Sequence, residues 1–343
     1  MEPGGVNMEQ NLFEEQKRQL SDEELSKTTL RYISSSQFII PTKSILEMEM
    51  KIQTWLTIGA CGCITYGRPR LGKTVCLNYI ANKIKENYKS DEIVIIWNIT
   101  DHPDTERNFY ASLLMAMGIE CPKRDTALLL KERVLNELIM RACETPYRRV
   151  VIFLDEAWKF QEKDFSWLMD LYNNLNGKDI QLAAFLFGTR ELKDLKTEFK
   201  RRGKDQIVGR FMINEVQFFG IRELSEMQFC LVFLDKMHMR ETLTSEAPET
   251  VLDFYFPNAD GKNFFSLAES YWNAFQKVRI SKNILAEDIP MKYLIDSFNI
   301  CLNSYGKLSP LSVSFPTEKE LINCVEMSGY GESDDEYEKR KKR

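Results

Sequence analysis

Short apolar runs alternate with helical patterns through the middle of this sequence. Runs of strand length cover residues 58–66, 93–99, 150–155, 181–187 and 212–219. Between them, apolar residues recur three and four positions apart, which is typical of amphipathic helices. Strands that alternate with helices pair in parallel, because each connection crosses over the sheet. The pattern therefore predicts a five-stranded parallel sheet between two layers of helices, a three-layer α/β/α sandwich.

The pattern changes after residue 220, where strand-length runs end and only helical spacing follows. We expect an α/β core over residues 57–220, then a small all-helical lid and further C-terminal helices over residues 221–328. The helical spacing is clearest at residues 222–239, 263–278 and 291–302.

Both ends of the chain are polar. Residues 1–28 are acid-rich and are expected to be flexible, whereas residues 29–56 read as a packed lead-in segment with a helix after Pro41. The last 13 residues contain five acids followed by five bases, so we expect residues 329–343 to be disordered. The basic end of this tail is either solvated or an electrostatic docking tag.

The composition fits a protein of the cytoplasm. The net charge of the 343 residues is −5, so attraction to nucleic acid requires a local basic patch. The eight cysteines show no C-x-x-C spacing, which fits reduced thiols, and two histidines argue against a histidine metal site. No apolar stretch approaches the ~20 residues that span a bilayer, and the first dozen residues lack the apolar centre of a signal peptide. We therefore expect no contact with a membrane.

A phosphate-binding loop follows the first strand run. It consists of Gly67, Arg68, Pro69, Arg70, Leu71, Gly72, Lys73 and Thr74, which match G-x-x-x-x-G-K-[ST] at every fixed position. The backbone N–H groups of such a loop bind nucleotide phosphates, while Lys73 is expected to reach the β- and γ-oxygens and Thr74 to hold Mg²⁺. The strand before the loop and the helix after it distinguish this match from a glycine-rich turn. The sequence thus predicts a site for ATP and Mg²⁺.

Two carboxylates end the third strand run. The apolar residues 150–154 precede Asp155 and Glu156, the pattern of a Walker B strand buried on both faces of a parallel sheet. At the carboxyl edge of the sheet, Asp155 is expected to reach the Mg²⁺ shell, and Glu156 to deprotonate a water that attacks the γ-phosphate. The alternative is an acidic N-cap for the next helix. A glutamate directly after the aspartate favours ATP hydrolysis over binding alone.

These motifs, followed by helical patterns, resemble AAA+ ATPases of the initiator and helicase-loader branch over about residues 55–280. Within that branch, GRPRLGKT, VVIFLDEA, LFGTRE and IVGRF are most similar to TnsC-type transposition regulators, including those of CRISPR-associated transposons. The resemblance implies a homo-oligomeric ring or filament on duplex DNA, without sequence preference. It further implies that the protein links a target-selection protein to transposase subunits.

Other residue roles come from the same resemblance. Thr189 lies where sensor 1 contacts the γ-phosphate or the attacking water; a Gly-Thr turn at a strand end is the alternative. Arg210 lies where the family presents an arginine finger to the neighbouring subunit, with Arg201 and Arg202 as rivals. The nearest match to the sensor-2 motif Gly-x-x-Arg has Phe264 in place of the arginine. We therefore expect hydrolysis to be slow or to depend on a partner.

Two regions are candidates for DNA contact. Lys123 and Arg124 lie in a loop that, by resemblance, lines the DNA-bearing pore of TnsC-like rings and contacts phosphates. In residues 188–210, basic side chains outnumber acidic ones, although an exposed charged helix face gives the same excess. The basic residues there are Arg190, Lys193, Lys196, Lys200, Arg201, Arg202, Lys204 and Arg210.

Two other function classes stay open on the sequence alone. A helicase loader has the same ATPase core and contacts single-stranded DNA. A signalling or scaffold ATPase does not bind nucleic acid.

Overall fold

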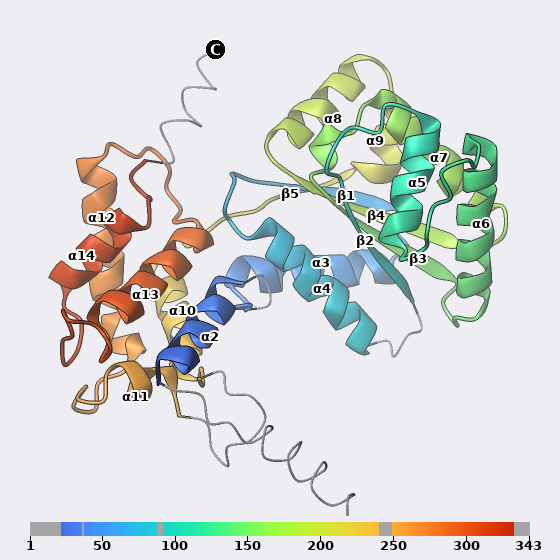
Figure 1. Ribbon diagram of the computed structural model, residues 1–343. Coiled ribbons are helices and arrows are strands. Elements are labelled where there is room, and N and C mark those ends of the chain that lie inside the picture. Colours follow the sequence, from blue (N-terminus) through green and yellow to red (C-terminus); the bar gives the residue numbers. More distant parts are fainter. Residues whose placement is uncertain (1–21, 36–37, 88–91, 240–248, 333–343) are drawn as a thin grey trace, which may run out of the picture. The chain divides into compact units, whose positions relative to one another are not determined.

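The computed structural model describes residues 22–35, 38–87, 92–239 and 249–332 (Figure 1). The chain divides into two compact units, one of residues 43–220 and one of residues 1–42 together with 221–343. The sequence predictions for residues 1–21 and 333–343 lie outside the described residues.

The first unit is built on a five-stranded parallel sheet in the order β2-β3-β4-β1-β5. The strands are β1 (Gly62–Tyr66), β2 (Ile93–Asn98), β3 (Arg149–Asp155), β4 (Gln181–Gly188) and β5 (Asn214–Gln217). This confirms the predicted fold class and the five strands. The first strand is shorter than predicted, because residues 58–60 form the hydrogen-bonded turn that ends α3. The order places β4 between β3 and β1, so the ends of these three strands lie side by side.

Helices cover both faces of this sheet (Figure 1). One face carries α3 (Lys43–Thr57) and α4 (Lys73–Asn87). The other carries α5 (Glu106–Ala116), α6 (Ala127–Cys143), α7 (Glu162–Asn176), α8 (Glu191–Arg201) and α9 (Asp205–Phe211), with the short 3₁₀ helix η1 (Ala157–Lys159) after β3. The unit is therefore the three-layer sandwich that the sequence predicts.

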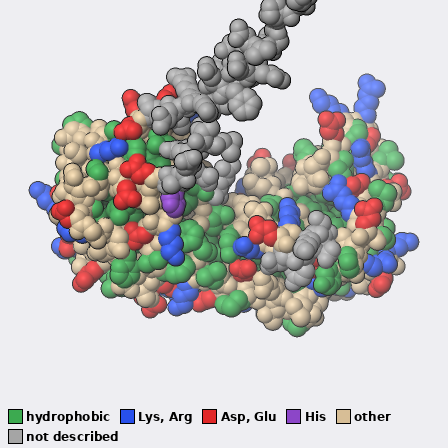
Figure 2. All heavy atoms as spheres, turned by 90° about the horizontal axis from the view of Figure 1, so that it is seen from below, with side chains coloured by type: hydrophobic (Ala, Val, Ile, Leu, Met, Phe, Trp, Pro, Cys, Tyr) green, Lys and Arg blue, Asp and Glu red, His purple; other side chains and the backbone are tan. Residues whose placement is uncertain are grey.

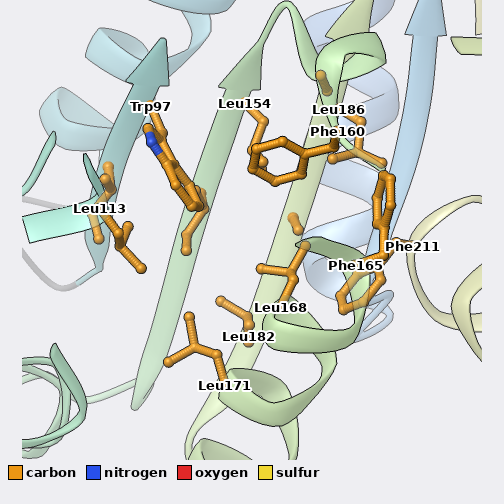
Figure 3. Close-up of a cluster of buried hydrophobic side chains, with 14 of the residues drawn as sticks. Trp97, Leu113, Leu154, Phe160, Phe165, Leu168, Leu171, Leu182, Leu186 and Phe211 are labelled. Carbon is orange, nitrogen blue, oxygen red and sulfur yellow. The ribbon is translucent and has the colours of Figure 1, made fainter. Parts of the chain in front are cut away.

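The strands are apolar at consecutive positions because helices bury both faces of the sheet. Along β3, Ile152 and Leu154 belong to the cluster packed under α5–α9, whereas Phe153 faces the other way and lies 5.4 Å from the ring of Phe185. Figure 3 shows the first of these clusters, in which Phe160 lies beside Leu154. A strand with both faces buried needs apolar residues at consecutive positions.

The second unit is all-helical in its described residues. It contains α2 (Asp22–Ser34), α10 (Leu224–Asp235), α11 (Val251–Tyr255), the 3₁₀ helix η2 (Phe264–Leu267), α12 (Ala268–Ser281), α13 (Met291–Tyr305) and α14 (Glu318–Met327). Aromatic edge-to-face pairs fill its core, including Phe264 with Phe298 at 4.9 Å. The predicted helical lid region is thus helical, and it also includes a helix from the N-terminal part of the chain.

The structure differs from the predicted boundaries at both ends. Residues 22–28, expected to be flexible, lie in α2, where Leu25 is buried and Ser26 Oγ is 2.7 Å from Tyr255 OH. The predicted lead-in segment 29–56 is divided, because α2 belongs to the helical unit and α3 to the α/β unit. Near the other end, Tyr330 is buried against Phe275, so the packed chain continues past residue 329. These contacts join residues far apart in sequence, which local spacing does not reveal.

Candidate functional site

The carboxyl ends of β3, β4 and β1 bring the predicted nucleotide residues to one edge of the sheet. Tyr66 at the end of β1 pairs with Gly188, and the N–H of Gly67 donates to the carbonyl of Gly188 at 3.3 Å. Asp155 ends β3, which is the neighbour of β4 on its other side. The phosphate-binding loop, Asp155 and Thr189 therefore start from three adjacent strands. Ligands of open α/β sheets bind outside this edge.

The loop between β1 and α4 has the backbone that phosphate binding requires. Arg70 and Gly72 adopt left-handed conformations, with φ of 66° and 98°. Such turns direct successive N–H groups into a concave anion site, and the N-terminus of α4 adds its dipole. At Gly67 a side chain is excluded, since a Cβ there would lie 2.6 Å from the carbonyl oxygen of Phe218. Within the loop, Leu71 is buried and packs the turn from inside, whereas Pro69 is exposed.

Lys73 lies against this loop. Its ammonium donates to the carbonyls of Gly67 at 3.0 Å and Arg68 at 2.7 Å, and the residue is buried. Burial lowers the pKa of Lys73, and the nearby carboxylates of Glu156 and Asp155 act in the opposite direction. The two carbonyl partners of Lys73 are neutral, so a phosphate bound in the loop would give this desolvated cation an anionic partner.

Thr74 and Asp155 form the second part of the site. The Thr74 hydroxyl donates to Asp155 Oδ2 at 2.6 Å, across 81 positions of sequence. Burial raises the pKa of Asp155, and the hydrogen bond from Thr74 opposes that shift. A hydroxyl and a carboxylate are hard oxygen ligands, and Mg²⁺ takes few protein ligands together with water and phosphate oxygens. The donor set therefore fits a nucleotide-bound Mg²⁺.

Glu156 follows in a left-handed conformation, with φ 56° and ψ 34°. Its N–H donates to Asp155 Oδ1 at 3.1 Å, and its Oε2 accepts a hydrogen bond from the indole Nε1 of Trp158. The carboxylate lies close enough to Lys73 to affect the pKa of that amine. The predicted base thus shares an edge of the sheet with the phosphate-binding loop.

Thr189 lies one residue beyond β4. Its hydroxyl oxygen is buried, and it has no hydrogen-bond partner among the residues that the structure describes. Buried hydroxyls almost always have a partner, and one without a partner in the protein fits a ligand oxygen. The position agrees with the predicted contact to the γ-phosphate or to the attacking water, which stays a prediction.

Arg210 is not brought together with these residues. It belongs to α9, and its guanidinium contacts α7, where Nη1 donates to Asn173 Oδ1 at 3.1 Å and the group lies 4.7 Å from the ring centre of Tyr172. Of its rivals, Arg202 forms ion pairs with Glu162 and Glu198, whereas Arg201 is exposed.

Lys123 and Arg124 belong to a different segment of the α/β unit. Both are exposed in the loop between α5 and α6. Arg107 of α5 fixes this loop, because its guanidinium donates to the carbonyls of Pro122, Lys123 and Asp125 at 3.2, 2.9 and 2.9 Å. The loop backbone is held from the protein side, so its two cations extend into solvent.

The basic excess of residues 188–210 is partly neutralised. Lys193 and Lys196 pair with Glu215 at 3.3 and 2.8 Å, and Arg202 and Lys204 pair with Glu162 at 2.8 and 2.6 Å. Arg190, Lys200 and Arg201 are exposed. The excess is therefore smaller in the structure than the count suggests. Figure 2 shows the molecule from below Figure 1, and basic and acidic side chains are interspersed on that face.

Two residues beside the predicted ones were not found by sequence reasoning. Trp158 binds Glu156, and Arg107 holds the Lys123–Arg124 loop. Neither belongs to a motif. Only the position of Trp158, two residues after the predicted base, could have directed attention to it.

Comparison with known proteins agrees with this geometry. The family model described as AAA domain matches residues 59–195. The chain shares its fold with the ORC2 protein of Aeropyrum pernix, solved as ADPNP-ADP complexes, at a TM-score of 0.50 and 13% identity over 87% of this chain and 71% of that one. It is also similar to Drosophila ORC bound to DNA, at a TM-score of 0.49 and 12% identity over 95% and 70% of the two chains. Among curated proteins, no sequence matches the chain.

The comparisons and the sheet topology together establish an AAA+ fold. None of the helices in the described residues has the length and apolar character needed to cross a bilayer.

Proposed function

We propose that this chain is an ATPase that assembles on duplex DNA and regulates DNA transposition by linking a target-selection protein to transposase subunits. The observation that carries the ATPase part is the Thr74–Asp155 hydrogen bond at 2.6 Å, beside Lys73 and Glu156. The AAA domain match and the fold shared with a protein solved with ADPNP and ADP support nucleotide binding. The transposition part rests on the sequence resemblance in LFGTRE and IVGRF.

The residues divide the chemistry among them. The loop N–H groups and Lys73 bind the phosphates. Thr74 and Asp155 would hold Mg²⁺, which when bound would supply positive charge to stabilise the transferring phosphate. Glu156 removes a proton from the attacking water. Thr189 donates its hydroxyl hydrogen bond to the γ-phosphate or orients that water.

The position of Arg210 supports assembly. Its guanidinium contacts α7 rather than its own Thr74–Asp155 pair, and an arginine finger acts on the nucleotide of a neighbouring subunit rather than on its own. ATP would then act mainly as a bond between subunits, because one subunit completes the site of the next.

DNA contact is assigned to the α5–α6 loop. Lys123 and Arg124 are exposed there, and Arg107 fixes the backbone from behind through three hydrogen bonds. A loop that is already ordered loses little conformational entropy on binding. Exposed lysine and arginine side chains bind phosphates, and phosphate contacts do not depend on sequence.

Replacing Lys123 and Arg124 together with alanine should weaken duplex binding about equally for all sequences. Each lost phosphate contact removes about 0.9 from the slope of log affinity against log salt concentration. We therefore expect the slope to become shallower by about two. Fluorescence anisotropy with two unrelated duplexes over a salt series measures both effects.

The matched control replaces Lys51 of α3 and Lys85 of α4, which are exposed on the helices that cover the other face of the sheet. It removes the same charge and should leave the slope unchanged. If the Lys123 and Arg124 variant keeps the parental slope, the DNA contact lies elsewhere, and the exposed cations of α8 become the next candidates.

The Glu156→Gln variant should bind ATP and assemble but hydrolyse it about 10²-fold more slowly or worse, because the amide keeps the shape and loses the basicity. Single-turnover hydrolysis and nucleotide titration measure the two properties separately. A parental single-turnover rate would exclude Glu156 as the base.

The proposed function is tested by electron microscopy of the protein with duplex DNA and a nonhydrolysable ATP analogue. We expect rings or filaments on the duplex, and subunits that stay separate when the nucleotide is omitted. Assembly on single-stranded DNA alone would support a helicase loader. Failure to bind either form of DNA at any salt concentration would support a scaffold ATPase.

A further inference from the structure

We infer that Trp158 positions the carboxylate of Glu156 for ATP hydrolysis. The inference rests on the proposed function, since it assumes that Glu156 is the base. Three observations carry it: the hydrogen bond of the indole, the packing of its ring, and the way the surrounding turn is anchored.

The first observation is the hydrogen bond from Trp158 Nε1 to Glu156 Oε2. An indole has a single donor, and here it is used on this carboxylate. Trp158 is 36% exposed and is the most exposed of the five tryptophans, all of which the structure describes. Burial of apolar area therefore explains its presence only in part, whereas the contact with Glu156 uses its polar group.

The second observation is the contact of the ring with the end of β4. A Cβ built on Gly188 would lie 3.2 Å from Cδ1 of Trp158, so the ring edge rests against a position that has no side chain. Gly188 immediately precedes Thr189, whose hydroxyl is the buried one without a described partner. The indole thus lies between the predicted base and the strand that carries the predicted γ-phosphate contact.

The third observation is that the turn around Trp158 is fixed on both sides. Ala157 and Phe160 are buried, and Phe160 packs beside Leu154 in the cluster of Figure 3. Lys159 donates through Nζ to the carbonyls of Ile99 and Thr100 at 2.9 and 2.6 Å. With its neighbours anchored, Trp158 presents the donor from a defined place.

Glu156 needs such support. Its left-handed backbone is uncommon for a residue with a side chain. A conformation of this kind persists where its surroundings determine it. The hydrogen bond to Oε2 fixes the orientation of the whole carboxylate, and therefore the directions from which a water can approach it. Trp158 is therefore a positioning residue that acts through Glu156.

The test is Trp158→Phe, which keeps a ring against Gly188 and removes the donor. We expect nucleotide affinity within about twofold of the parent and a single-turnover rate lower by about tenfold to a hundredfold, the range for a slightly misplaced catalytic group. Trp167→Phe is the matched control, because Trp167 packs on Phe109 of α5 and should leave the rate unchanged. Incorporation of 3-benzothienylalanine at position 158 preserves the bicyclic shape without the N–H and should reproduce the loss.

A double-mutant cycle separates positioning from a general structural effect. If Trp158 acts through Glu156, adding Trp158→Phe to Glu156→Gln should slow hydrolysis no further. A further loss of the size seen in the parent would overturn the inference, as would parental rates for both position-158 variants. If Glu156→Gln itself hydrolyses ATP at the parental rate, the proposed base is wrong; if it is slow while the position-158 variants are not, only the role of Trp158 is wrong.

Discussion

Arg210→Ala should bind ATP in its own site as the parent does, while hydrolysis by the assembled protein falls by up to ~10³-fold or more, the effect of losing an arginine finger. Arg210 belongs to α9, and its guanidinium contacts Tyr172 and Asn173 of α7 rather than the Thr74–Asp155 pair. If it stabilises transition-state charge, that charge belongs to a neighbour. Nucleotide titration and steady-state hydrolysis measure the two halves of this expectation.

Mixing two inactive variants provides the decisive measurement. Arg210→Ala keeps a complete phosphate-binding loop, and Lys73→Ala keeps the arginine, so an interface between them contains one complete site. Activity should reappear in the mixture. If the mixture stays inactive although mixed oligomers form, the arginine does not act across the interface.

Variants of Arg201 and Arg202 test whether one of these residues, rather than Arg210, is the arginine finger. Arg201→Ala removes an exposed rival, and Arg202→Ala removes one that already pairs with Glu162 and Glu198. A large loss in one of these and none in Arg210→Ala would transfer the role. Thermal unfolding of Arg210→Ala checks its fold, since the contact with Tyr172 contributes only about 0.5–1 kcal/mol at an exposed site.

Lys73→Ala should abolish nucleotide-dependent assembly. Charge-assisted hydrogen bonds contribute about 1.5–3 kcal/mol each, and two to phosphate oxygens correspond to a loss of roughly a hundredfold or more in ATP affinity. Titration with a fluorescent ATP analogue measures the affinity, and light scattering with duplex DNA measures assembly. Lys83→Ala on the same helix is the matched control, because Lys83 pairs with Glu86 away from the loop.

A Lys73→Ala protein that binds ATP as tightly as the parent would contradict the assignment of the phosphate-binding loop. The comparison with Glu156→Gln is informative here. Lys73→Ala should lose ATP binding, whereas Glu156→Gln should lose only hydrolysis. If the two variants behave alike, the separate roles assigned to Lys73 and Glu156 are wrong.

The sheet and the nucleotide motifs could be predicted because both depend on residues that are close together in sequence. A strand such as β3, buried between two helical layers, must be apolar at consecutive positions, and its carboxyl end must lie at the ligand edge. Lys73 and Thr74 are fixed relative to one another by a loop of eight residues. The hydrogen bond between Thr74 and Asp155 depends in addition on the strand order, which the alternation of elements does not predict.

The rest depends on contacts that have no local signature. The pairing of Lys196 with Glu215 and of Arg202 with Glu162 reduced a basic excess that a count along the sequence overstated. Trp158 lies in a short 3₁₀ turn, where neither helical nor strand periodicity assigns a direction to a side chain. The packing of α2 with α11 joins positions 229 apart in sequence.

That last contact bears on how the protein is made. In the helical unit, α2 precedes the α/β unit in sequence and the other described helices follow it, so ribosomal synthesis delivers α2 long before its partners. The apolar face of α2, with Leu25 and Ile33, therefore lacks its packing partners until the whole α/β unit has been synthesised. Early folding of that unit would replace a long flexible loop by a compact body and lower the entropy lost when α2 meets Tyr255. A circular permutation that moves α2 to the other terminus would make all the described helices of the helical unit consecutive in synthesis.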